Sequence, residues 1–430
     1  MSQLSMNQKE MSPATWVPTV YFAMGMPFIL ISLVSVLMFQ DLGIGDAQIA
    51  FWTSLIILPY SLKPLWSPFM ELYKTKKFFV VTTQFVSGLT LALVALSLPL
   101  PNYFSMSIAF LALLGISGAT HDVATDGVYL TELTKAQQSQ YIGWQGAAYN
   151  AAKILANGGL VFLAGVLKDH FGVLYAWMFI MAICAGILVL CGFYHMRMLP
   201  SKHQVKNENK TAHEVLVKLW EVIVSFFQKK HVWYYIIFII LYRFAEGFAM
   251  KIVPLFLKAS VENGGLGLTN QEVGLVYGTA GSAAFIIGSL IGGYFIAARG
   301  LKRSLFILCC IFNIPFLVYA LLAWYQPSNL YLIGTAIFAE YFGYGFGFVG
   351  LMLFMMQQVA PGEHQMAHYA FASGIMNLGV MIPGGISGFM SDALGYQHFF
   401  LFVLIATIPA FLITWFVPFT HPDPAVSEQK

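Results

Sequence analysis

The sequence predicts an all-α integral membrane protein with twelve transmembrane helices arranged as two six-helix halves. Hydrophobic residues make up 58% of its 430 residues, charged residues make up 10%, and the mean hydropathy is +0.73. A soluble domain is usually about a quarter charged, so this composition indicates a chain whose solvent is the lipid bilayer. The apolar stretches are continuous rather than alternating, which favours helices over a transmembrane β-barrel.

Twelve apolar stretches are long enough to cross a bilayer, which takes about 20 residues each. We predict spans at 16–39, 47–69, 78–98, 104–130, 141–167, 173–194, 232–257, 270–297, 304–324, 329–357, 366–390 and 398–418. Residues 197–231 are polar and rich in Lys, which predicts a cytoplasmic linker with an amphipathic helix around 214–227. The two halves are then 1–196 and 232–430. All four cysteines lie inside spans, so we expect no disulfide framework, no metal site and no cofactor.

Positively charged residues are concentrated on one side of the predicted spans. The outer loops hold only Lys168 and Lys258. The inner loops and tails hold Lys9, Lys74, Lys76, Lys77, Lys135, Arg197, Lys202, Lys206, Lys210, Lys218, Lys229, Lys230, Arg299, Lys302, Arg303 and Lys430. The positive-inside rule therefore predicts that both termini and the linker are cytoplasmic.

The two halves repeat each other. Ser67–Lys77 (SPFMELYKTKK) follows the second span as Gly292–Arg303 (GGYFIAARGLKR) follows the eighth. Two six-helix halves in parallel repeat are the layout of the major facilitator superfamily, whose substrate site lies between the halves near the middle of the membrane. The second loop resembles that superfamily's Gly-x-x-x-Asp-Arg-x-Gly-Arg-Arg motif without its acid, and the first loop keeps an acid. We therefore predict gating roles for Glu71, Arg299, Lys302 and Arg303.

Four longer segments resemble one branch of this superfamily. LKPLWSPFMELY (Leu62–Tyr73), SGATHDVATDGVYLTEL (Ser117–Leu133), LYRFAEGFAMKIVPLFL (Leu241–Leu257) and AIFAEYFGYGFGFVGLMLFM (Ala336–Met355) are similar, in the same order and spacing, to segments of the AmpG-like muropeptide permeases, within the peptide/acetyl-coenzyme-A transporter family. The resemblance implies import of anhydro-muropeptides, which are sugar-peptide fragments of the cell wall, driven by the proton gradient. It places a Lys or an acid of those permeases at Lys63, Asp122, Asp126, Glu246 and Glu340.

Charged residues inside the spans are the candidate functional groups, because each costs about 2.5–3.5 kcal/mol at the bilayer centre. Glu246 and Glu340 lie near the middle of their spans, and we predict that at least one carries a coupled proton. The alternative is a structural ion pair with Arg243 or Lys153. These two cations are also candidates to bind an anionic group of the substrate.

Asp122 and Asp126 are four residues apart and therefore share one helix face. They lie in the cytoplasmic half of their span, where they could couple protons or lock a gate. The cations available for such a lock are Lys74, Lys76 and Lys77.

Other polar and aromatic residues of the spans have weaker signals. We expect His121 to satisfy a neighbouring acid, and Lys63 to extend its amino group to the membrane interface. Candidates for stacking on a sugar ring are Tyr21, Trp144, Tyr149, Tyr242 and Tyr341.

These observations predict a secondary active transporter and not an enzyme. It would import anhydro-muropeptides or related amino-sugar oligosaccharides with protons across a bacterial inner membrane. Its partners would be the small solute, protons and lipid, with no nucleic acid, and it would act as a monomer. The alternatives are a symporter for another disaccharide or small solute, a non-transporting sensor, and a membrane-embedded transferase, which the short outer loops disfavour.

Overall fold

The computed structural model describes residues 11–44, 46–72, 74–201 and 212–422, and every regular element in these stretches is a helix. Eight helical stretches among them are long and apolar enough to cross a membrane. Each of the twelve predicted spans is found as a helix, although some are interrupted and some are joined. Of the cations used for orientation, five lie outside the described residues, namely Lys9, Lys202, Lys206, Lys210 and Lys430.

The first half contains the six spans predicted before the linker. Their helices are α1 (Pro13–Ile29) with α2 (Ser35–Asp41), α3 (Asp46–Leu62) with α4 (Ser67–Leu72), α5 (Lys76–Ser97), α6 (Tyr103–Glu132), α7 (Lys135–Lys153) and α8 (Val161–Met198). The fifth and sixth spans form one continuous helical stretch that turns at Gly172, whose φ is 79°. Glycine adopts this left-handed conformation without the steric cost of a Cβ atom.

The second half repeats this arrangement. Its helices are α10 (Val232–Tyr242) with α11 (Phe244–Lys258), α12 (Asn270–Val273) with α13 (Gly281–Arg299), α14 (Leu301–Asn313) with α15 (Leu317–Tyr325), α16 (Leu330–Phe354), α17 (Gln365–Ala406) and α18 (Ile408–Trp415). The turn at Gly395 in α17, with φ of 68°, corresponds to the turn at Gly172. The repeat seen in the sequence is therefore a repeat of the structure.

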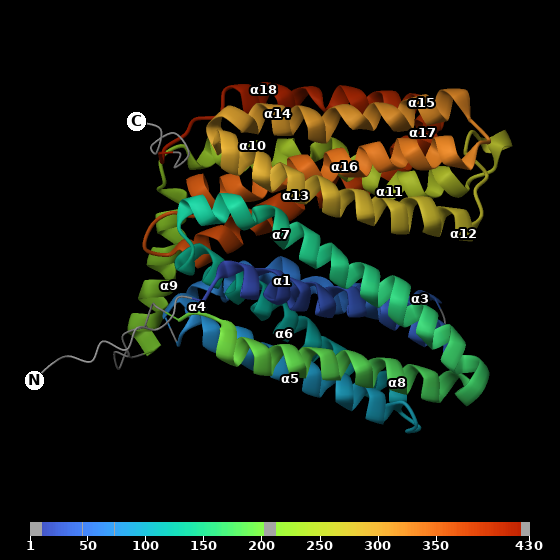
Figure 1. The fold of residues 1–430 in the computed structure, drawn as a ribbon, viewed down its shortest axis with the longest axis horizontal. Coiled ribbons are helices and arrows are strands. Elements are labelled where there is room, and N and C mark those ends of the chain that lie inside the picture. Colours follow the sequence, from blue (N-terminus) through green and yellow to red (C-terminus); the bar gives the residue numbers. More distant parts are fainter. Residues whose placement is uncertain (1–10, 45, 73, 202–211, 423–430) are drawn as a thin grey trace, which may run out of the picture.

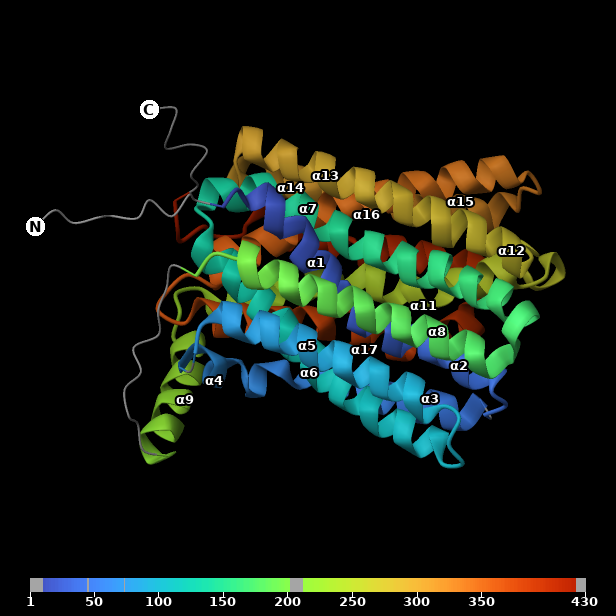
Figure 2. The same ribbon diagram turned by 60° about the horizontal axis from the view of Figure 1, so that its bottom comes forward.

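The predicted linker helix is confirmed as α9 (Ala212–Phe227). It crosses one end of the molecule beside α4, roughly perpendicular to the long helices (Figures 1 and 2). Val222 and Phe226 of α9 are buried against the bundle. We refer to this end as the α9 end.

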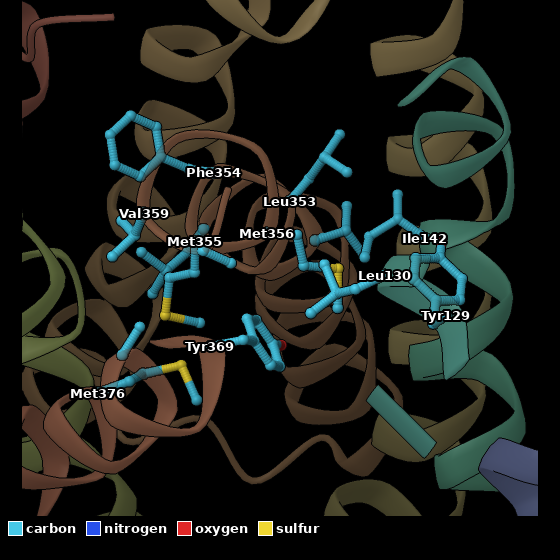
Figure 3. Packing of buried hydrophobic residues seen from close by; sticks show 14 of the residues in the cluster. Tyr129, Leu130, Ile142, Leu353, Phe354, Met355, Met356, Val359, Tyr369 and Met376 are labelled. Carbon is cyan, nitrogen blue, oxygen red and sulfur yellow. The ribbon is translucent and has the colours of Figure 1, made fainter. Parts of the chain in front are cut away.

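The buried apolar side chains of the described residues form three clusters, and one of these contains residues of both halves. At the end opposite α9, Leu98 belongs to a cluster made only of first-half residues, and Leu268 belongs to a cluster made only of second-half residues. Near the α9 end a third cluster, the shared core, joins both halves. Figure 3 shows its centre, where Tyr129 and Ile142 lie near Met356 and Tyr369. Among the described residues, the buried apolar core that joins the halves thus lies near the α9 end, whereas the cores at the opposite end each belong to one half.

Helices α7 and α13 form a second contact between the halves, along which glycines allow close approach (Figure 1). A Cβ atom on Gly143 would lie 2.3 Å from the Ser289 carbonyl oxygen, and one on Gly293 would lie 2.7 Å from the Gly143 nitrogen. Ser289 also donates a hydrogen bond to the Gly143 carbonyl, at 3.2 Å. Small residues at such crossings let helix backbones pack closely in a membrane.

Gly143→Val is expected to push α7 and α13 apart and to lower the thermal stability of the purified protein. A matched control is Gly158→Val, because nothing lies within 4 Å of a Cβ atom at Gly158. Overpacking costs about 1–3 kcal/mol, so the unfolding midpoint of the first variant should fall clearly below that of the second. Equal midpoints for the two variants would contradict the close α7–α13 contact.

Candidate functional site

A buried cluster of charged residues lies in the first half. Lys63 forms an ion pair with Asp122, and the Tyr21 hydroxyl donates a hydrogen bond to Asp126 at 2.8 Å. The side chains of Lys63 and Asp122 are 8% and 12% exposed. Lys63, Asp122 and Asp126 are called the first charge cluster below.

A break between α3 and α4 places Lys63 in this cluster. The chain forms a short 3-10 turn at Lys63–Leu65, where Pro64 lacks the N–H that would continue an α-helix. The predicted extension of Lys63 to the membrane interface is wrong, because the side chain is buried and paired. A carboxylate one helix away is a nearer partner for the ammonium group than water at the interface.

The predicted lock between the acids of α6 and the lysines after α4 is not formed in this structure. Among the described residues, Asp122 pairs with Lys63, whereas Lys76 pairs with Glu71 at 3.4 Å and Lys77 donates to the Leu199 carbonyl at 2.7 Å. His121 does not satisfy Asp122 or Asp126. Its ring nitrogens lie 2.9 Å from the Gln84 amide and 3.3 Å from the Thr125 hydroxyl, within a separate polar network.

Three further tyrosines surround the first charge cluster. Tyr60 and Tyr149 are close enough to Asp122 to interact electrostatically with it. Tyr369 of α17 interacts with both Asp122 and Asp126, so the second half contributes to the surroundings of this cluster. The Tyr60 hydroxyl is buried without a hydrogen-bond partner among the described groups, which leaves a donor available to a ligand.

The second half contains a similar arrangement at a helix break. Arg243 separates α10 from α11 with φ and ψ of −106° and 6°, and its guanidinium donates to both Glu246 carboxylate oxygens, at 2.6 and 2.5 Å. The guanidinium carbon lies 5.0 Å from the centre of the Phe348 ring. This is the two-bond geometry for which arginine is suited. Of the two interpretations of Glu246, the ion pair with Arg243 is thus the one that the structure contains.

Glu340 lies beside this ion pair without joining it. Its carboxylate accepts a hydrogen bond of 2.7 Å from the Tyr319 hydroxyl. Glu246 and Glu340 line a cavity of about 30 Å³ together with Tyr277, Tyr319, Tyr341 and Tyr344. A cavity of this size admits water but not a sugar ring. Arg243, Glu246 and Glu340 are called the second charge cluster below.

The structure does not bring Lys153 into either cluster. Lys153 is half-buried at the end of α7, and no hydrogen bond or ion pair of its amino group is found among the described residues. Its predicted role in binding an anionic group of the substrate stays a prediction.

The residues with predicted gating roles differ in their positions. The Glu71 carboxylate accepts hydrogen bonds from the backbone N–H groups of Met366 and Ala367, at 2.7 and 3.1 Å. It thereby links α4 of the first half to the N-terminus of α17 in the second half. Arg299, Lys302 and Arg303 are exposed, and Arg299 stacks on Phe295 with the guanidinium carbon 4.7 Å from the ring centre.

Most of the aromatic residues proposed to stack on a sugar have other partners. Trp144 donates to the Tyr294 hydroxyl at 3.1 Å, and Tyr242 donates to the Gly347 carbonyl at 2.9 Å. Tyr341 lines the cavity of the second charge cluster. The positions of Tyr319 and Tyr60 beside acids could not be predicted from the sequence. Each is one of 21 tyrosines, and the acid that it faces lies on another helix.

Comparisons with known proteins agree with this architecture. An anhydromuropeptide permease of Escherichia coli K12 is 27% identical over 406 residues, which cover 91% of this chain and 77% of the permease. An uncharacterized protein of Haemophilus influenzae is 23% identical over 412 residues, which cover 92% of each chain. The resemblance to muropeptide permeases is therefore confirmed, and the chain is a multi-pass membrane transporter for a small molecule.

Solved structures with low sequence identity share the fold. The Escherichia coli fucose:proton symporter FucP matches with a TM-score of 0.71 at 14% identity, covering 94% of this chain and 98% of that chain. A bacterial homologue of the iron transporter ferroportin, in an outward-facing state, matches with a TM-score of 0.68 at 13% identity and the same coverage. The sequence profile of the Major Facilitator Superfamily matches residues 19–364 and 241–430. The chain therefore belongs to the Major Facilitator Superfamily.

Proposed function

We propose that this transporter imports anhydro-muropeptides, or related amino-sugar oligosaccharides, together with protons across a bacterial inner membrane. The observation that carries the proton coupling is Glu340, a buried acid that lines a water-sized cavity and has a tyrosine as its hydrogen-bond partner. A buried carboxyl group whose hydrogen-bond partner is a neutral hydroxyl can bind and release a proton without breaking an ion pair. The 27% identical anhydromuropeptide permease supports the substrate class.

Transport would proceed by alternating access between two halves, 1–196 and 232–430, joined by the linker 197–231. The shared core and the Glu71 contact seal the halves together near the α9 end, whereas separate cores lie at the opposite end. Lys76, Lys77 and Arg299 lie at the α9 end, in agreement with a cytoplasmic position for this end and for both termini. On this proposal the structure is the outward-facing form of a monomer.

The charged residues would divide between substrate and proton. Lys153 has no carboxylate partner among the described residues, so it is proposed to bind the carboxylate of a muramyl group or of the attached peptide. Arg243 is held by Glu246 and would bind an anion only if that pair opened.

The proposal predicts that Glu340→Gln abolishes proton-driven accumulation. Without a titratable group at this position the transport cycle loses the proton that the second half must bind and release, so uptake should reach only the external concentration. The measurement is uptake of labelled GlcNAc–anhydro-MurNAc, with and without peptide, into proteoliposomes with an inward proton gradient. Glu246→Gln is measured in parallel, and Glu262→Gln, at an exposed acid of the 3-10 turn Val261–Asn263, is the matched control.

Two outcomes would contradict parts of this proposal. Unchanged accumulation in the double variant Glu246→Gln/Glu340→Gln would remove both acids from proton coupling. Absence of uptake by well-folded wild-type protein would exclude the muropeptide substrate, and a panel of other disaccharides would then be tested.

A further inference from the structure

The two charge clusters have the same composition and the same internal connections. Each contains one cation and two carboxylates, and in each the cation forms an ion pair with one carboxylate, Lys63 with Asp122 and Arg243 with Glu246. In each the second carboxylate accepts a hydrogen bond from a tyrosine on another helix instead. Tyr21 of α1 donates to Asp126 at 2.8 Å, and Tyr319 of α15 donates to Glu340 at 2.7 Å.

The charge of each cluster is not balanced if all of its groups ionise. One positive and two negative charges would leave one uncompensated negative charge, and an isolated charge away from water costs several kcal/mol. Asp126 and Glu340 are each 6% exposed, and no ion pair of either is found among the described residues. Binding of one proton makes each cluster neutral.

The ion pairs decide which acid in each cluster takes the proton. A carboxylate that is paired with a buried cation is held in its charged form, whereas a carboxylate whose partner is a neutral hydroxyl is not. Asp122 and Glu246 are therefore the charged members. The titratable and charged groups near Asp126 and Glu340 are mostly tyrosines. Those near Asp126 are Tyr21, Lys63, Asp122, Tyr129 and Tyr369. Those near Glu340 are Tyr319, Glu246, Tyr277, Tyr341 and Tyr344.

We propose that Asp126 and Glu340 are two separate proton-binding sites, one in each half, and that both hold a proton in this conformation. This inference rests on the proposed function, because it gives the number and places of the coupled protons. The two sites differ in access. Glu340 lines a cavity, whereas Asp126 is close enough to Tyr369 and Tyr129 of the shared core to interact with them electrostatically. Separation of the halves near the α9 end would remove Tyr369 from Asp126 and open this site alone.

Infrared spectroscopy of the full-length protein in lipid tests the proposal without any substrate. A protonated carboxylic acid has a C=O stretching band that is distinct from carboxylate bands and shifts in D₂O. At neutral pH the wild type should show two such bands from buried acids. Asp126→Asn should remove one of them, Glu340→Gln should remove the other, and the matched control Glu262→Gln should remove neither.

Charge balance gives a second test that needs neither of those variants to fold. Lys63→Met removes the cation of the first charge cluster, so Asp122 should gain a proton and a third band should appear. Arg243→Met should act in the same way on Glu246. A wild-type spectrum without protonated carboxyl bands, or bands that all four variants leave unchanged, would overturn the proposal. The infrared experiment uses no substrate, so its failure refutes the two protonated sites. A failed uptake experiment refutes the proposed substrate or its coupling to protons.

Discussion

Glu71→Ala is expected to shift the transporter away from the form that is sealed at the α9 end. The Glu71 carboxylate accepts two hydrogen bonds from the first turn of α17, at 2.7 and 3.1 Å, where the partial positive charge of a helix N-terminus also favours an anion. A hydrogen bond to a charged group contributes about 1.5–3 kcal/mol. Loss of one such bond would change the ratio between the form sealed at the α9 end and the form open there by roughly 10- to 150-fold.

The shift can be measured as a distance distribution between spin labels at Lys74 and Arg303, two exposed positions in different halves at the α9 end. The four native cysteines would first be replaced. Glu71→Gln keeps an oxygen acceptor but loses the charge, so it should lie between the wild type and Glu71→Ala. Asp169→Asn makes the same charge change at an exposed position at the opposite end and serves as control. Equal distributions for Asp169→Asn and Glu71→Ala would refute the role of Glu71.

Arg243→Met is expected to destabilise the folded protein strongly, whereas Arg243→Met combined with Glu246→Gln should recover much of the loss. Arg243 and Glu246 satisfy each other through two hydrogen bonds, at side-chain exposures of 8% and 6%. Removal of Arg243 alone forces Glu246 either to take up a proton or to stay charged without compensation, and breaking a buried pair in this way costs about 3–5 kcal/mol, while removal of both partners is often nearly neutral.

Thermal unfolding of the purified protein in detergent measures this effect. The matched control is Arg299→Met, which removes an arginine from an exposed position outside the clusters. The midpoints should fall in the order control, double variant, single variant. A single variant as stable as the control would show that the pair does not stabilise the second half.

Much of the fold could be predicted from local sequence. Apolar length placed all twelve spans within a few residues, and the amphipathic pattern around 214–227 placed α9. Glycines marked the turns at Gly172 and Gly395 because only they adopt the left-handed backbone there without strain. The in-span charges were also visible, since a charged residue in an apolar run contrasts with everything around it.

The partners of those charges were decided by tertiary structure. Arg243 and Glu246 are three residues apart, so their pairing could be anticipated from one helix face. Lys63 and Asp122 are separated by 59 residues, Tyr21 and Asp126 by 105, and Tyr319 and Glu340 by 21. Each of these pairs joins different helices, and the spacing of residues along one helix carries no information about which neighbour packs against it. The sequence by itself determined that buried charges exist, and helix packing decided which are paired and which can hold a proton.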